Sequence, residues 1–311
     1  MSFDLRSAAS LALLLALLLT ACTEDLVVDL DDADKDRLAA FVERDGAPEV
    51  GDLIDFTPSE TTAYGHLDHL AWDAIARRYN QDGQLAYSDF AADPDSVELL
   101  DTYLALLASA DPDALDSDTE RLAFWLNAYN ALVFREAARR RAADPAFSVA
   151  DDDFAFFKTR THIVGGELYS LDQLEHGIVR GDRTHASVAD LDDAAWAPFA
   201  SRHTGVFAAG PTDPRVHIGL NCASRSCPRL PAYAYTAATL NDALDTQTAD
   251  FVADPTRGAG PDGISMLFVW FESDFAATHT SPRGFIEAFR ADVSGVNFDA
   301  TLEYDWTLNG E

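Results

Sequence analysis

No other segment of the chain gathers as many reactive side chains as the stretch from Arg215 to Pro228. It contains one histidine, His217, and two cysteines, Cys222 and Cys227, which are five positions apart. A thiolate can act as a nucleophile or a metal ligand, and a nearby imidazole can accept its proton. We therefore expect the functional site here, where an apolar run ending at Leu220 is predicted to form a buried strand that leads into a polar loop.

Three hypotheses are open for these side chains, and the one we favour is thiol catalysis. Cys222 would be the nucleophile of a hydrolase or acyltransferase, His217 its general base, and Glu175 the carboxylate that orients the imidazole. Backbone amides after Cys222 would stabilise the oxyanion. No cofactor is expected for this chemistry, and the ligand would be an unidentified small molecule or peptide.

The two alternatives use the same residues differently. A structural disulfide between Cys222 and Cys227 would close a loop of six residues and stabilise the fold by only about 2 kcal/mol. The protein would then be a non-catalytic binding or scaffolding protein. A zinc site would combine His217, Cys222 and Cys227, with His176 as a further ligand, although the cysteine spacing is not that of a CxxC pair.

Two asparagines lie inside a predicted helix that must position this loop. The helix begins at a capping box, Ser117 to Glu120, and continues to Arg141. Asparagine is unfavourable inside a helix because its amide competes for backbone hydrogen bonds. Asn127 and Asn130 are therefore predicted to be buried amides that bond loops crossing the helix, with substrate contact as the alternative.

A second capping box, Ser170 to Gln173, opens a short helix that carries Glu175 and His176. Adjacent side chains on an α-helix diverge by about 100°, so these two are not expected to converge on one atom. One of them would face the site or the core, and the other would face water.

The remaining pattern indicates an α+β protein. Helices are predicted over residues 61–79, 96–108, 194–201 and 239–251, and a further helix begins at Ser281-Pro282. Gly165-Gly166 predicts a hairpin within residues 156–169, and strands are predicted over residues 264–271 and 301–308. Without regular βαβ alternation, we expect one domain of several helices packed on a small, mainly antiparallel sheet.

The charge balance excludes nucleic acid as an expected partner. The 311 residues include 53 acidic and 22 basic ones, a formal net charge of -31 spread along the whole chain. Nucleic-acid binding needs a basic surface. A strongly acidic surface stays hydrated in concentrated salt, so we interpret it as a halophilic adaptation, with a surface for a cationic ligand as the alternative.

The first residues resemble the signal peptide of a bacterial lipoprotein. A leucine-rich core, Leu11 to Leu19, is too short to span a bilayer and is followed by Thr20-Ala21-Cys22. We expect a signal peptide at 1–21, a lipid on Cys22, an acidic tether at 22–58 and a globular domain at 59–311. The protein would be anchored to a membrane of the bacterial cell envelope, on its non-cytoplasmic side. An ordinary secretory signal is the alternative.

Four segments together resemble the family called domain of unknown function 547. They are Phe124–Ala131, Ser170–Gly177, His217–Pro228 and Tyr304–Asn309. The family commonly has glycine and lysine where this chain has Ala223 and Arg225. The resemblance implies no settled activity, but it strengthens the choice of site. The predicted binding residues around the nucleophile are Asn127, Asn130, His176, Asn221 and Cys227.

Overall fold

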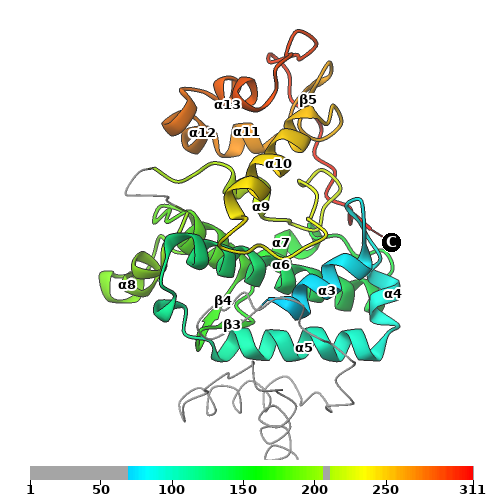
Figure 1. Ribbon diagram of the computed structural model, residues 1–311, viewed down its shortest axis with the longest axis vertical. Coiled ribbons are helices and arrows are strands. Elements are labelled where there is room, and N and C mark those ends of the chain that lie inside the picture. Colours follow the sequence, from blue (N-terminus) through cyan, green and yellow to red (C-terminus); the bar gives the residue numbers. More distant parts are fainter. Residues whose placement is uncertain (1–68, 206–210, 311) are drawn as a thin grey trace, which may run out of the picture.

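The computed structural model describes residues 69–205 and 211–310 (Figure 1). The predicted signal peptide, lipidation site and tether lie outside these residues, as do residues 61–68 of the first predicted helix. The described chain is an α+β domain of helices with small antiparallel hairpins, as expected. No helix in its described part is long and apolar enough to cross a membrane.

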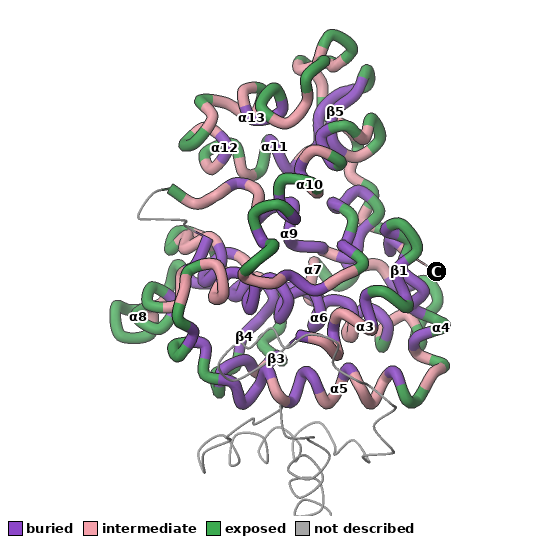
Figure 2. The backbone as a smooth tube through the Cα atoms, in the orientation of Figure 1, coloured by how far each residue is buried: buried purple, intermediate pink, exposed green. Residues whose placement is uncertain are grey.

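The first part of the fold is a helical layer built around one long helix. Its elements are α3 (Leu70–Tyr79), β1 (Asn80–Gln81), β2 (Gln84–Leu85), α4 (Tyr87–Ala91), α5 (Pro94–Ser109), η1 (Pro112–Ala114) and α6 (Asp118–Ala143). Helix α6 begins at the predicted capping box: Ser117 Oγ accepts from Glu120 N, and the Glu120 carboxylate accepts from Ser117 N. Its apolar face is buried almost throughout, so α6 forms the centre of the main core (Figure 2).

The middle of the chain adds a hairpin and three helices, of which η2 packs against α6. Its elements are α7 (Asp151–Lys158), β3 (His162–Val164), β4 (Glu167–Tyr169), the π-helix η2 (Gln173–Val179) and α8 (Asp193–Arg202). Gly165 and Gly166, with φ of 59° and 76°, make the predicted turn, since both positions require a left-handed backbone. Each described sheet is a single antiparallel pair of strands rather than part of one larger sheet.

The later elements surround a second, smaller core. They are α9 (Val216–Gly219), α10 (Leu240–Ala253), β5 (Ala259–Gly260), β6 (Gly263–Ile264), α11 (Leu267–Trp270), α12 (Glu272–His279) and α13 (Pro282–Phe289). Phenylalanines from α10 to α13 fill this core, and α10, α11, α12 and α13 lie together in the upper part of Figure 1. The predicted helices at 194–201, at 239–251 and after Ser281 are confirmed.

The strand predicted before the cysteine loop is wrong, because Val216–Gly219 is a single helical turn. Asp213 Oδ1 accepts from Arg215 N and starts the turn. Val216 then packs in the main core and Ile218 in the second core. The apolar run that predicted a strand is therefore a helical turn whose apolar side chains are buried in two different cores.

Two later strand predictions are also wrong. Only Ile264 of the segment predicted at 264–271 lies in a strand, β6, because Ser265 Oγ accepts from Leu267 N and α11 begins there. Residues 301–308 form isolated bridges instead of a strand. One such bridge, Ser224 with Leu308, attaches the C-terminal segment to the cysteine loop.

Candidate active site

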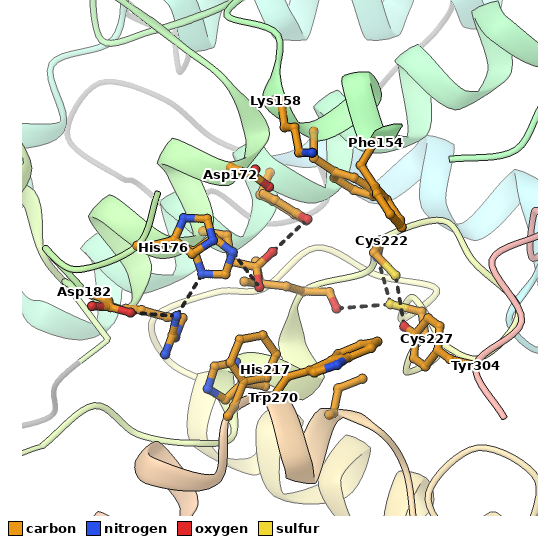
Figure 3. Close-up of a pocket in the computed structure, with 18 of the residues that line it drawn as sticks. Phe154, Lys158, Asp172, His176, Asp182, His217, Cys222, Cys227, Trp270 and Tyr304 are labelled. Carbon is orange, nitrogen blue, oxygen red and sulfur yellow. Dashed lines mark hydrogen bonds and ion pairs between the residues drawn. The ribbon is translucent and has the colours of Figure 1, made fainter. Parts of the chain in front are cut away.

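A cleft of about 690 Å³ opens between the two cores. Tyr129 and Leu220 of the main core and Leu267 of the second core line it. The predicted residues Cys222, Cys227, His217, Glu175 and His176 all line this one cleft. Figure 3 shows the cysteines with Tyr304 on the right of the cleft and His176 with Asp182 on the left. The fold therefore brings these predicted residues into one cleft, although their partners within it differ from those predicted.

One end of the cleft, here called the sulfur end, consists of Cys222, Cys227, Ser224 and Tyr304. Both cysteines are free thiols; Cys222 is half-buried and Cys227 is buried. The Cys222 sulfur lies 3.1 Å from Ser224 Oγ and 3.3 Å from Tyr304 Oη. The backbone N–H of Cys222 donates to Cys227 Sγ at 2.8 Å. The thiol that faces the cleft is thus surrounded by hydrogen-bond donors.

These contacts make the two thiols unequal. Burial acts to raise the pKa of the Cys222 thiol, but the hydrogen bonds to Cys227, Ser224 and Tyr304 outweigh it and the net pKa is lowered. Burial, followed by the hydrogen bond and charge of Cys222, holds the pKa of Cys227 well above its usual value. Cys222 is therefore the thiol that ionises first, as a nucleophile requires.

The loop backbone is fixed by amide groups rather than left free to bind an oxyanion. Asn221 Oδ1 accepts from Ala223 N, and Asn221 Nδ2 donates to Pro228 O. The N–H groups of Arg225 and Ser226 donate to carbonyls of the C-terminal segment. The predicted use of loop amides as oxyanion donors is therefore wrong for these positions, and the Tyr304 hydroxyl is the polar group that lies 3.3 Å from the sulfur.

Ala223 adopts a φ of 60°, a left-handed conformation that glycine tolerates better than alanine. The family that this chain resembles commonly has glycine at this position, so the alanine here adopts a backbone conformation that strains it. Ala223 has no exposed surface, and its carbonyl accepts from Asn309 N. The strained residue is thus held in place by the packed C-terminal segment.

The other end, called the imidazole end, consists of His217, Asp274, Arg180 and His176. His217 Nε2 lies 2.9 Å from Asp274 Oδ2, and its ring stacks on Phe271 with centroids 3.9 Å apart. Because a carboxylate only accepts hydrogen bonds, Nε2 carries the proton. Nδ1 is buried without a hydrogen-bond partner, so the described His217 presents one free lone pair.

The imidazole is neutral and its carboxylate is charged. Burial lowers the pKa of His217 more than the hydrogen bond to Asp274 raises it. Burial acts to raise the pKa of Asp274, but hydrogen bonds from His217 and Arg180 hold it well below the usual range. Arg180 Nε donates to Asp274 at 2.9 Å, so the carboxylate that orients His217 is itself fixed by a nearly buried guanidinium.

Glu175 does not take the predicted place beside His217. Its carboxylate accepts from Tyr129 Oη at 3.0 Å, and Asp274 occupies the position assigned to it. Neither ring nitrogen of His217 bonds a sulfur of the described cysteines. The predicted Cys222, His217 and Glu175 are thus brought into one cleft without forming a contiguous triad.

Glu175 and His176 both line the cleft, whereas one of them was expected to face water. Their side chains are 17% and 11% exposed, and His176 Nε2 lies 4.0 Å from Glu175 Oε1. Residues 173–179 form a π-helix rather than the α-helix on which that expectation was based. His176 also bonds Arg180 through Nδ1 and stacks on His185 at 3.6 Å.

Asp172, at the N-terminal end of η2, is a functional candidate that the sequence analysis missed. Burial, followed by the charge of Glu175, raises its pKa to about 7. It lines the cleft, so it can hold or release a proton near neutral pH. Its place three residues before Glu175 was visible in the sequence, but only its burial indicates this role.

Asn127 and Asn130 are structural anchors and do not line the cleft. Asn127 pairs with both the N–H and the C=O of Tyr235. Asn130 donates to Gly219 O and accepts from Asn221 N. Asn130 therefore fixes the short link between His217 and Cys222, as the prediction of buried amides bonding crossing loops proposed.

An aromatic wall, defined as Phe154, Trp270, Tyr304 and Trp306, borders the sulfur end. Trp306 packs against each of the other three, with centroids between 4.4 and 5.5 Å apart. Trp270 remains 43% exposed. Since Tyr304 also contacts the Cys222 sulfur, a group bound to that sulfur would lie against this wall.

The zinc hypothesis gains no support from this arrangement. His217 bonds Asp274 rather than facing the thiols. Among residues 69–205 and 211–310, no group of three or more histidine, cysteine, aspartate or glutamate side chains is placed to hold a metal ion.

The comparison with known families is informative over the centre of the chain. Residues 112–252 match the family model described as "Protein of unknown function, DUF547". This segment, just under half of the chain, supports the resemblance to domain of unknown function 547. No curated protein and no solved structure matches the chain. The DUF547 segment contains His217 and both thiols, whereas Asp274 and Tyr304, which complete the two ends of the cleft, follow it.

Proposed function

We propose that the cleft catalyses cysteine-dependent acyl transfer, either hydrolysis or transfer to another acceptor. The observation that carries the proposal is the Cys222 thiol, which borders the cleft with hydroxyl groups at 3.1 and 3.3 Å from its sulfur. Hydroxyl donors stabilise a thiolate without a neighbouring base. The neutral His217, oriented by Asp274, supports a separate role as general base in the same cleft.

In the first half of the reaction, the Cys222 thiolate attacks the acyl carbonyl carbon and forms a thioester. The bond to the leaving group breaks, and the leaving group takes a proton from Asp172, whose pKa of about 7 suits this transfer. The Tyr304 hydroxyl, beside the sulfur, donates to the developing oxyanion.

In the second half, His217 Nδ1 takes a proton from water or an alcohol, whose oxygen attacks the thioester. Cys222 leaves as the thiolate that its hydrogen bonds stabilise. The imidazolium then returns its proton, through solvent, to the Asp172 carboxylate. The aromatic wall would hold the acyl group, which favours substrates whose acyl part is apolar.

The test is to incubate the reduced protein with a series of aryl esters and thioesters and to follow the intact mass. We expect one acyl adduct, mapped to Cys222, that forms quickly and then decays. Cys222→Ala should form no adduct while keeping a similar melting temperature. Acylation of other residues only, or equal turnover by the alanine variant, would overturn the proposal.

We also propose that the protein is a bacterial lipoprotein of the cell envelope, acylated at Cys22. The leucine core followed by Thr20-Ala21-Cys22 supports this. Expression with a labelled fatty acid should give a labelled, membrane-bound protein, and Cys22→Ala should remove both properties. A Cys22→Ala protein that still fractionates with membranes would contradict the anchor.

A non-catalytic binding role is the second candidate, and the exposed Trp270 favours it. An indole that is 43% exposed beside three further aromatic rings is a common ligand platform. Quenching of tryptophan fluorescence by an ester analogue, with no acyl adduct at any residue, would favour this role over catalysis.

A further inference from the structure

The sulfur end contains a feature that acyl transfer does not use, namely a second thiol in contact with the nucleophile. Cys227 Sγ accepts from Cys222 N at 2.8 Å, and the two thiols hydrogen-bond each other. With standard bond lengths, this contact limits the Cα separation to below ~7 Å, which is close to the range of disulfides. The backbone separation is therefore compatible with a disulfide between the two cysteines.

The two thiols also differ in access. Both cysteines line the cleft, but Cys222 is half-buried, whereas Cys227 is only 4% exposed. An external reagent would therefore reach Cys222 first, and Cys227 is placed to react with a group already attached to Cys222. One accessible thiol with a buried second thiol at contact distance is the arrangement that thiol–disulfide exchange requires.

We propose that Cys222 and Cys227 catalyse thiol–disulfide exchange with disulfide-containing peptides that enter the cleft. The proposal uses the same nucleophile as the proposed acyl transfer but not His217, so the two activities can fail separately. Neither a permanent structural bridge nor a metal site is part of it.

The steps balance in atoms and electrons. The Cys222 thiolate attacks one sulfur of the peptide disulfide, the S–S bond breaks, and the departing thiolate takes a proton from solvent. Cys227 then loses its proton to solvent and attacks Cys222 Sγ, which releases the second peptide thiol. The substrate gains two electrons, the protein pair loses two, and an external dithiol restores the protein.

The stabilised thiolate affects the step that regenerates the reduced protein. Hydrogen bonds from Ser224 and Tyr304 stabilise the reduced state of Cys222. Stabilising the reduced state makes the oxidised pair a better oxidant. The bridged form should therefore be reduced readily by the external dithiol, which completes the cycle.

The test uses the reduced full chain and oxidised glutathione as the disulfide probe. Wild-type protein should lose two hydrogens in mass, with peptide mapping placing the bridge at Cys222–Cys227, and dithiothreitol should reverse it. Cys227→Ser should instead accumulate a glutathione adduct on Cys222, whereas Cys222→Ser should react at least tenfold more slowly at Cys227. These readouts are independent of acylation.

A turnover assay completes the test. The wild type should speed the reduction of a disulfide-containing peptide by dithiothreitol at least tenfold over Cys227→Ser. The proposal is overturned if the bridge forms only in urea-unfolded protein, if both serine variants react equally, or if no adduct accumulates on Cys222. The oxidation of the wild-type protein by oxidised glutathione needs no substitution, so this measurement remains decisive even if a serine variant fails to fold.

Discussion

The two ends of the cleft hold their reactive side chains, Cys222 and His217, with opposite kinds of neighbours. At the sulfur end, neutral hydroxyl and thiol donors surround Cys222 and stabilise a negative charge there. At the imidazole end, full charges on Asp274 and Arg180 fix His217, which itself remains neutral. The comparison indicates that nucleophile and base are prepared independently, each by its own neighbours, and that a substrate must connect them.

The largest effect is expected from removing the charge at the imidazole end. Asp274→Asn would let the amide donate to Nε2 and leave the proton on Nδ1, the wrong tautomer for a base. We expect acyl turnover to fall about 1,000-fold, whereas the rate of Cys222 alkylation by iodoacetamide stays within about twofold. Glu272→Gln, an exposed position on the same helix, is the control for charge alone. If alkylation slowed as much as turnover, the two ends would not be independent.

The second test breaks the link between the ends. Asn130→Ala removes the amide that pairs with Gly219 O and Asn221 N, so the buried N–H of Asn221 loses its partner and Gly219 O keeps only the hydrogen bond from Tyr235 Oη. We expect a loss of about 3 kcal/mol in the free energy of unfolding, measured with urea. The exposed Asn241→Ala on α10 should cost less than about 0.5 kcal/mol. A loss below about 1 kcal/mol for Asn130→Ala would show that the link is held by other contacts.

Asp172 offers a test by pH, because its pKa is about 7 in the fold and near 3.8 when exposed. Folding thus favours the protonated carboxyl, and the associated stability is present below about pH 4 and is lost as the pH rises through 7. Asp172→Asn should gain about 2 kcal/mol over wild type between pH 4 and pH 8, half of the ~4 kcal/mol that the full shift implies, since solvent reaches part of the carboxyl. Exposed Asp116→Asn should show no such change. A pH-independent difference would contradict the raised pKa.

The smallest effect concerns one hydroxyl at the sulfur end. Tyr304→Phe removes a donor to the Cys222 sulfur, so the thiol pKa should rise. Alkylation by iodoacetamide at pH 7 should slow by about tenfold, with the pH profile moved upward by about one unit. Tyr233→Phe, in a separate groove, is the matched control. An unchanged profile would mean that Ser224 and Cys227 suffice to stabilise the thiolate.

Local signals predicted the parts of the fold that depend on local chemistry. The capping box at Ser117 begins α6, and Gly165-Gly166 turns the hairpin, because both effects act within a few residues. The sequence predicts a strand at Val216–Gly219, where the structure has a helical turn. The Asn130 side chain that donates to Gly219 O lies far away in the chain, so no local signal marks this turn. Periodicity cannot distinguish these two structures in a short apolar run.

The site was predicted in location but only partly in its partners. Cys222 and His217 could be named because reactive residue types lie together in one short stretch. Asp274 could not, since it lies 57 residues beyond His217 on a helix with no distinguishing motif. Its role depends on the packing of α12 against α9, which only the tertiary structure shows.

The π-helix at residues 173–179 makes this cleft sensitive to chain length as well as to residue type. A one-residue deletion there would restore an ordinary α-helical ladder and rotate the residues before it by about 100° relative to those after it. A deletion after His176 would turn Glu175 and His176 together away from Arg180, which bonds His176 Nδ1 in the full-length helix. A shortened variant of that kind would keep these side chains but lose the contact between His176 and Arg180.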